Sequence, residues 1–199
     1  EQRGKTETLE LVRDILPSGD GIASRFDAVP FFGALYFAAD GGNGFELWRT
    51  QGTGATTVEV ADINPGNNDS RPKYLTSAGP FLAFQADDGS GAEPFVFDGL
   101  NARMLADLNS TGGSDPEGFF PSRGLVWFTA DAGSGSELHV TDGTTGGTRL
   151  VADVRPSGSA YAIPRFATAT QLLFTATDDT HGRELWETDG TAAGTRLLL

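Results

Sequence analysis

The feature that most constrains this chain is a unit that occurs four times within its 199 residues. In each copy an aromatic run is followed by a Gly-rich loop, then by Glu and two larger, mostly apolar residues. The Glu residues recur at intervals of 47, 44 and 47 residues, at Glu46, Glu93, Glu137 and Glu184. A second column recurs at intervals of 48, 45 and 46 residues, at Asp14, Asp62, Asp107 and Asp153. Two columns with one period indicate a repeat architecture.

Each unit has the pattern of short strands. Residues 35–38 and 172–175 are apolar or aromatic runs, while 46–50 and 184–188 alternate polar and apolar side chains, which is typical of half-buried strands. The Gly-rich stretches 142–148 and 189–195 predict hairpin turns into strands at 149–151 and 196–198. A further strand is expected near 73–76 and around its counterparts Phe26, Phe119 and Arg165. No segment sustains a helical period, so helix is expected to be minor.

Four antiparallel strands in a unit of about 46 residues match the size of a propeller blade. The sequence therefore predicts an all-β fold, a β-propeller of four four-stranded blades. The units are 16–62, 63–107, 108–153 and 154–199, with 8–15 as an extra terminal strand. A β-solenoid is disfavoured because its strands are parallel. Three arrangements follow: a closed four-blade ring, which the four complete units favour, an arc of a larger propeller or longer array, and an arc that completes a larger ring by self-association.

Composition excludes several classes of function. The formal net charge of -13 repels phosphate backbones, so no nucleic-acid partner is expected. No apolar run approaches the roughly 20 residues of a membrane span, so no membrane insertion is expected. The absence of Cys excludes disulfides, thiolate catalysis and Cys-ligated metals, and two His residues restrict triads and multi-His sites to few arrangements. Signatures of common hydrolases and nucleotide-binding loops are missing from the sequence.

Acidic residues gather in the Gly-rich loops that join the aromatic strand to the Glu-containing strand. Carboxylates and carbonyls in such loops are the ligands of Ca²⁺, which predicts a candidate structural calcium site. The favoured alternative is that Asp caps its own turn and Glu bonds backbone amides, since the loops lack EF-hand spacing. No other cofactor is expected. The candidate metal ligands are Asp40, Glu46, Asp87, Asp88, Glu93, Asp131, Glu137, Asp178, Asp179 and Glu184.

Aromatic residues outside the repeated core are the candidates for ligand binding. Aromatic faces stack on sugar rings, and Tyr74 and Tyr161 lie near the connectors, where blade surfaces vary. His181, in a polar turn beside two acids, completes the candidate ligand-binding set. Trp48, Trp127 and Trp186 lie inside the repeat and are expected in the core, and His139 is expected to be packed or at the surface.

One motif within the units carries a family resemblance. Residues 184–191 have the sequence Glu-Leu-Trp-Glu-Thr-Asp-Gly-Thr, followed by Gly194 and Thr195. This resembles the bacterial ELWxxDGT repeat, a family of β-propeller-type arrays in large secreted and cell-surface proteins. The first unit has Thr-Gln-Gly-Thr at 50–53 in place of the Asp-Gly-Thr end, the third has His139 for Trp, and the second is the most degenerate. The resemblance implies a propeller and an extracytoplasmic location, secreted, periplasmic or at the cell surface, and no single activity.

The sequence favours a non-catalytic role. We expect a binding or scaffolding β-propeller of an exported bacterial protein that recognises a protein or glycan partner. One alternative is a structural subunit of a larger surface assembly. Another is a hydrolase or lyase with a site at the propeller axis, built from acids together with Arg25, Arg71 and Arg165.

Overall fold

The computed structural model describes residues 11–22 and 27–198. Four antiparallel sheets make up the fold, each built from four consecutive strands in chain order. Sheet 1 contains β1 (Ala28–Phe31), β2 (Ala34–Asp40), β3 (Phe45–Thr50) and β4 (Val58–Ala61), with the 3-10 turn η1 (Gly54–Thr56) before β4. Sheet 2 contains β5 (Lys73–Ser77), β6 (Leu82–Asp87), β7 (Ala92–Phe97) and β8 (Ala102–Met104).

The second half of the chain repeats this organisation. Sheet 3 contains β9 (Glu117–Ser122), β10 (Leu125–Asp131), β11 (Ser136–Thr141) and β12 (Arg149–Ala152). Sheet 4 contains β13 (Ile163–Ala167), β14 (Leu172–Asp178), β15 (Gly182–Thr188) and β16 (Arg196–Leu197). The all-β prediction with four four-stranded sheets is therefore confirmed. In the described residues no helix is long and apolar enough to cross a membrane.

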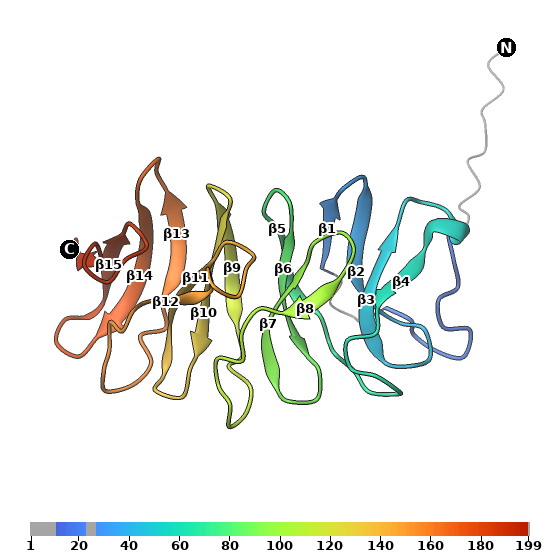
Figure 1. Cartoon of the computed structure of the whole chain (residues 1–199), viewed down its shortest axis with the longest axis horizontal. Coiled ribbons are helices and arrows are strands. Elements are labelled where there is room, and N and C mark those ends of the chain that lie inside the picture. The colour runs from blue at the N-terminus through green and yellow to red at the C-terminus, as the bar shows by residue number, and fades with distance from the viewer. Residues whose placement is uncertain (1–10, 23–26, 199) are drawn as a thin grey trace, which may run out of the picture.

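The four sheets stand side by side in a row, with sheet 1 and sheet 4 at opposite ends (Figure 1). Neighbouring sheets meet through their first strands, since β1 contacts β5, β5 contacts β9 and β9 contacts β13. The favoured closed four-blade ring is thus wrong, and the described sheets form an open arrangement. Closing four sheets requires a turn of about 90° between neighbours. Buried apolar layers join sheet 1 to sheet 2, sheet 2 to sheet 3 and sheet 3 to sheet 4, and none of the layers of described residues joins sheet 4 to sheet 1.

Apolar side chains fill each gap between sheets. Between sheets 1 and 2 the buried layer includes Tyr36, Leu47 and Phe84, and between sheets 3 and 4 it includes Trp127 and Phe174. A smaller layer of Ala, Val, Leu and Phe side chains joins sheets 2 and 3. These layers form because successive residues of a strand point to opposite faces, so each sheet buries one set against each neighbour.

Most of the expected core residues are buried. Trp127 is fully buried and Trp48 is 5% exposed, whereas Trp186 in sheet 4 is only half-buried. His139 is also buried, and its ring stacks on Phe128 with centroids 5.6 Å apart. Trp186 packs against the layer between sheets 3 and 4, whereas Trp48 is covered by Ile15.

Connecting segments join each sheet to the next. We call residues 62–72 connector 1, 105–116 connector 2 and 153–162 connector 3, and we call residues 11–22 the N-terminal segment. Strand was expected at 8–15, but residues 11–15 of the N-terminal segment form none, and residues 8–10 lie outside the described residues. The strand expected around Phe26 also falls on a position outside them.

The N-terminal segment packs against sheet 1 without joining it as a strand. Ile15 contacts the layer of Phe37, Ala39 and Trp48. The Arg13 guanidinium lies 5.7 Å from the Trp48 ring centroid and donates hydrogen bonds to the carbonyls of η1 and of the residue after it. Within the described residues, side-chain packing and these bonds therefore stand in place of the strand pairing expected for 8–15.

Candidate functional site

The Asp residues at the end of the second strand cap their own turns in the first three sheets. Each accepts two backbone N–H bonds through Oδ1, one from the residue two positions on and one from the residue four positions on. The distances are 2.7 and 3.1 Å for Asp40, 2.8 and 3.0 Å for Asp87, and 2.7 and 3.0 Å for Asp131. Asp88 accepts from Ser90 N at 3.1 Å and Ser90 Oγ at 2.6 Å. These contacts are local turn caps.

The fourth turn is built differently because its hairpin is one residue longer. Glu46 pairs with Ala39 across sheet 1, a separation of seven, whereas Glu184 pairs with Ala176 across sheet 4, a separation of eight. Asp178 Oδ1 accepts from Thr180 N at 2.9 Å, and Asp178 Oδ2 lies 2.7 Å from His181 Nδ1. The His181 contact lowers the pKa of Asp178 below its usual range. His181 is therefore engaged within its own turn.

Asp179 leaves that turn and meets connector 3. Its carboxylate accepts from Ser157 Oγ and from Arg155 Nε, the latter at 3.1 Å. These bonds, with the Ser157 hydroxyl first, hold the pKa of Asp179 below its ordinary value. Asp178 thus caps its own turn, whereas Asp179 bonds connector 3.

The repeated Glu residues brace each sheet to the connector that leaves it. Glu46 Oε2 accepts from Ile63 N at 2.7 Å and from Ser70 Oγ at 2.6 Å, and Oε1 accepts from Ser70 N at 3.1 Å. Glu93 makes the same three bonds to connector 2, with Leu108 N at 3.1 Å, Ser114 N at 2.9 Å and Ser114 Oγ at 2.6 Å. All these carboxylates are buried. Each one therefore satisfies buried backbone donors of the connector, and Ile63 N, Leu108 N and Ser114 N have no other acceptor among the described residues.

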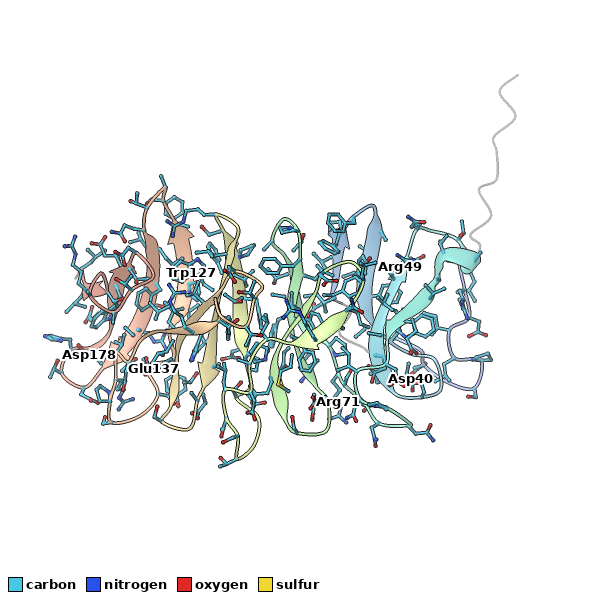
Figure 2. The ribbon with its side chains drawn as sticks, viewed as in Figure 1. Asp40, Arg49, Arg71, Trp127, Glu137 and Asp178 are labelled. Carbon is cyan, nitrogen blue, oxygen red and sulfur yellow. The ribbon has the colours of Figure 1, made fainter. Side chains whose placement is uncertain are left out.

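Glu137 (Figure 2) is the third brace and lacks one of these bonds. It accepts from Val154 N and Ala160 N, both at 3.1 Å, but Ala160 has no hydroxyl to donate. Burial raises the pKa of Glu46 and Glu93 against the opposing effect of their Ser bonds. Burial and the Asp153 charge raise the pKa of Glu137 to about 7. The pKa of the buried Glu137 carboxyl thus lies near neutral pH.

Glu184 is the exception in this column. Its side chain is half-buried, and no donor within residues 11–22 and 27–198 bonds its carboxylate. Over the same residues no group of three or more His, Cys, Asp and Glu side chains suits a metal ion. The candidate calcium ligands are therefore spread over four turns and three braces, and the structure does not gather them around one point.

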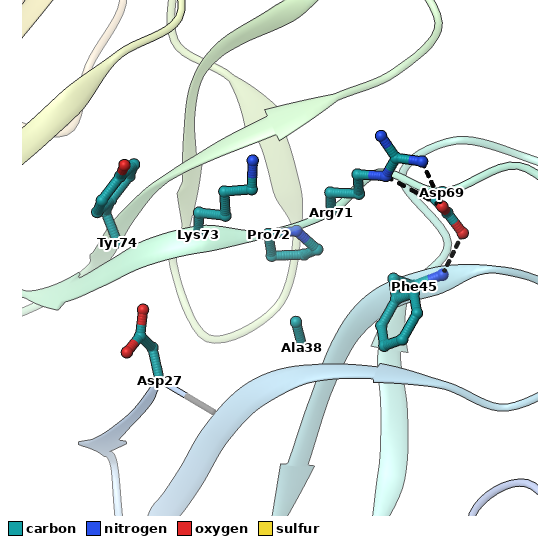
Figure 3. A pocket seen from close by; sticks show the side chains of 8 residues that line it. All are labelled: Asp27, Ala38, Phe45, Asp69, Arg71, Pro72, Lys73 and Tyr74. Atoms are coloured by element: carbon teal, nitrogen blue, oxygen red, sulfur yellow. Dashed lines mark hydrogen bonds and ion pairs between the residues drawn. The ribbon is translucent and has the colours of Figure 1, made fainter. Parts of the chain in front are cut away.

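A hollow of about 430 Å³ lies between sheets 1 and 2 (Figure 3). Strand β5 and the end of connector 1 supply one wall, and β2 and β3 supply another. The lining residues are Asp27, Ala38, Phe45, Asp69, Arg71, Pro72, Lys73 and Tyr74. Of the sequence candidates for ligand binding, Tyr74 is the one that lies here.

Two cations and two carboxylates line the hollow: Arg71, Lys73, Asp27 and Asp69. Arg71 Nε and Nη2 both lie 3.0 Å from Asp69 Oδ2, and Asp69 Oδ1 accepts from Phe45 N at 3.0 Å. The Phe45 bond, and then Arg71, keep the pKa of Asp69 below its ordinary value. Lys73 is exposed and has no ion pair in the described part of the chain. The Lys73 ammonium is therefore the group open to an anionic ligand.

Tyr74 belongs to a column of stacked rings. Its ring is stacked on Phe119 at 6.4 Å, Phe119 on Phe128 at 5.2 Å, and Phe128 on His139 at 5.6 Å. The Tyr74 backbone has a φ of 57°, a left-handed conformation that a non-Gly residue adopts only when its surroundings hold it. The column thus fixes the ring at the edge of the hollow.

The other sequence candidates lie elsewhere. Tyr161 is 55% exposed on connector 3, and His181 lies in the β14–β15 turn of sheet 4, so the structure does not bring them to Tyr74. Arg165 lies on β13 and donates to Thr175 Oγ1, far along the row from Arg71, and Arg25 is outside the described residues. Lys73 and Asp69 were missed by the sequence reasoning. The signal for them was the charged run around Pro72 just before a strand.

Comparison with known proteins bears on the fold alone. No family model matches the chain, and no curated protein matches it. The chain is similar to a solved acylaminoacyl peptidase of Pyrococcus horikoshii, with 13% identity and a TM-score of 0.56 over 88% of this chain and 27% of that one. It is also similar to a puromycin hydrolase, with 17% identity and a TM-score of 0.55 over 82% of this chain and 26% of that one. The chain thus spans about a quarter of these structures, and its all-β fold is consistent with a propeller.

Proposed function

We propose that this chain is a non-catalytic binding or scaffolding module of propeller type, part of an exported bacterial protein that acts outside the cytoplasm. The partner is a protein or a glycan, and the hollow between sheets 1 and 2 is where it binds. The export follows from the resemblance of the repeat to arrays of secreted and cell-surface proteins.

The observation that carries the proposal is the composition of this hollow. It places the Tyr74 ring, the Lys73 ammonium, which has no ion pair among the described residues, and the Phe45 side chain within one concave surface. An aromatic ring beside a cation suits a sugar ring that bears a carboxylate, and the lining carboxylate of Asp69 is already paired with Arg71. The repeated acids support a non-catalytic role, because most of them are occupied by turns and braces.

An uronic-acid oligosaccharide is the first ligand to test. Isothermal titration calorimetry compares oligogalacturonate with a neutral oligosaccharide of equal length. We expect the acidic ligand to bind more tightly, and its affinity to fall as salt is raised, because Lys73 is exposed to solvent. Tyr74→Ala and Lys73→Gln should each weaken binding by about tenfold, which corresponds to about 1.4 kcal/mol.

Tyr161→Ala is the matched control. Tyr161 is also a tyrosine with positive φ, at 49°, but it lies away from the hollow, so this change should leave the affinity unaltered. Equal losses for Tyr74→Ala and Tyr161→Ala would place binding elsewhere. Equal affinity for the acidic and neutral ligands would remove the role given to Lys73.

A further inference from the structure

The two ends of the row of sheets carry complementary halves of one repeated interface. Inside the chain, each sheet is joined to the next by three kinds of contact. A Glu accepts amide bonds from the connector, a Gly makes room for that connector, and in two of the joints an Arg reaches a turn of the next sheet. At each end of the row, one partner of each contact is present, and the other partner is missing from the described chain.

The first kind of contact is open at sheet 4. Glu46, Glu93 and Glu137 each accept bonds from two connector amides, whereas Glu184 accepts none from the described residues. The matching donors at the other end are the amides of Ile15 and Gly21. They stand at the positions of Val154 and Ala160, and no acceptor for them lies in the described chain.

The glycine before each Glu shows where a connector lies. A Cβ built on Gly44, Gly91 or Gly135 would come within 2.1 to 2.5 Å of the backbone of the connector. A Cβ on Gly182 would meet nothing within 4 Å. Gly182 therefore borders an open space of the kind that a connector fills in the other three sheets.

Glycines in the turn before the fourth strand show a matching open space at the sheet 1 end of the row. In the turn before the fourth strand, a Cβ on Gly143 would lie 2.7 Å from Phe81 of sheet 2, and one on Gly190 would lie 3.3 Å from Trp127 of sheet 3. The counterpart in sheet 1 is Gly52, which meets nothing within 4 Å. Gly52 thus faces the space where a preceding sheet would pack.

Arginine side chains also join neighbouring sheets inside the row and lack that contact at its ends. Arg103 donates to the Gly143 carbonyl at 2.7 Å, and Arg149 donates to the Gly190 carbonyl at 3.0 Å, so each joins its sheet to a turn of the next. Arg196 begins β16 as Arg149 begins β12, but it folds back onto Glu187 of its own sheet. Arg196 and the Gly52 carbonyl are the unmatched halves of this contact.

The N-terminal segment has the sequence of a connector. Residues 14–21 are Asp-Ile-Leu-Pro-Ser-Gly-Asp-Gly and residues 153–160 are Asp-Val-Arg-Pro-Ser-Gly-Ser-Ala. Each run accepts a backbone hydrogen bond from the sheet that follows it in the chain. Asp40 N donates to the Gly21 carbonyl at 2.9 Å, and Thr177 N donates to the Ala160 carbonyl at 2.8 Å. The side of the segment that would face a preceding Glu is unoccupied by the described chain.

We propose that sheet 4 is a docking surface for a second copy of this chain, whose residues 14–21 seat against Glu184 and Gly182 and whose sheet 1 follows in the row. The contact is head-to-tail, because the two surfaces differ. Such contacts close into a ring if the rotation between copies permits it and otherwise extend into a filament. We take a second copy as the occupant because this chain supplies both halves of the contact, one on its N-terminal segment and sheet 1 and the other on sheet 4, at opposite ends of the row (Figure 1).

The first experiment measures the mass of the whole chain by light scattering over about a hundredfold range of concentration. We expect the mass to rise from 20.9 kDa with concentration. Gly182→Ala should weaken the association by about tenfold or more, because the new Cβ occupies the space of the docked backbone. Gly124→Ala is the matched control, since Gly124 also has a positive φ, 75° against 81°, and open space around it, but lies in the β9–β10 turn.

A mixing experiment tests the direction of the contact. Gly52→Phe should block the sheet 1 end, and Gly182→Ala the sheet 4 end, so neither variant should associate alone. An equimolar mixture keeps one intact pair of surfaces and should form a two-copy species. A mixture that stays at 20.9 kDa would overturn the proposal, as would a wild-type chain that is monomeric at every concentration.

One outcome identifies a different occupant. If the wild-type chain is monomeric and Gly182→Ala lowers its melting temperature more than Gly124→Ala does, sheet 4 is covered within a single copy. That result would contradict a second-copy partner and would indicate intramolecular closure.

Discussion

The third strands of sheets 3 and 4 each carry a Glu at the matching position of the repeat, yet Glu137 and Glu184 have opposite environments. Glu137 is 3% exposed and accepts two connector amides, and its pKa is raised to about 7. Glu184 is half-buried and has no bonded donor among the described residues. The difference teaches that the motif supplies an acceptor, while the segment packed against it decides whether this acceptor is a structural brace.

The largest effect should come from removing a brace. Glu93→Ala leaves Leu108 N, Ser114 N and Ser114 Oγ without their acceptor in a buried place, which should lower the free energy of unfolding by about 3–5 kcal/mol. Glu184→Ala is the matched change and should cost less than about 0.5 kcal/mol. Urea denaturation at a concentration where the chain is monomeric measures both. Equal costs would show that the two carboxylates do not differ in the way described.

The pH dependence of stability should isolate Glu137. Its pKa is 4.5 in an ordinary setting and about 7 in the native chain, so the native state keeps the proton that the unfolded chain releases. This proton on Glu137 adds up to about 3 kcal/mol to the free energy of unfolding. The added stability is fully present below pH 4.5 and is lost as the pH rises through about 7.

Glu137→Gln should remove that part of the pH dependence. The free energy of unfolding of the wild type, minus that of the variant, should fall between pH 5 and pH 8 by up to about 3 kcal/mol. Denaturation at several pH values measures this difference, in which the contributions of Glu46 and Glu93 cancel. A difference that is constant over the range would show that Glu137 titrates like an exposed carboxyl.

The glycines beside the two Glu residues offer a smaller contrast. Gly135→Ala places a Cβ 2.5 Å from the Gly158 carbonyl carbon, whereas Gly182→Ala meets nothing within 4 Å. Both changes carry the cost of positive φ, so their difference reports the clash, which we expect to be about 2 kcal/mol. Thermal unfolding at low protein concentration measures it. Variants of equal stability would contradict the close packing of connector 3 on sheet 3.

The smallest effect is a gain. Ala160→Ser restores the hydroxyl that Ser70 and Ser114 place 2.6 Å from their Glu partners. The new bond should lower the pKa of Glu137 and stabilise the chain by about 1 kcal/mol at pH 8. NMR titration of the carboxyl follows the pKa. An unchanged pKa would mean that the missing hydroxyl does not explain why Glu137 titrates so high.

Local features of the sequence were sufficient for the elements of this fold. The alternation at 46–50 predicted β3, and the Gly-rich stretch 142–148 predicted the turn before β12, because pleat and positive φ are properties of neighbouring residues. The Asp capping of these turns was foreseen for the same reason. A strand was expected at 8–15, but its described part, 11–15, forms none, because Ile15 and Arg13 pack their side chains against sheet 1 instead.

The candidate site was predictable only in part. Tyr74 stood out as an aromatic beside a connector, but its partner Lys73 and the pair of Asp69 and Arg71 did not, because the hollow needs two sheets to form. Tyr161 and His181 were equally strong candidates in the sequence, but they lie on connector 3 and on sheet 4, away from the hollow.

The sequence by itself determined the repeat, the four-stranded units and the turn chemistry, since each depends on residues close together in the chain. The tertiary structure alone decided that the row of sheets stays open, that three Glu residues are braces while Glu184 is not, and where the hollow lies. These features depend on how one unit packs against another, and identical motifs acquire different roles when only some of them have a neighbour.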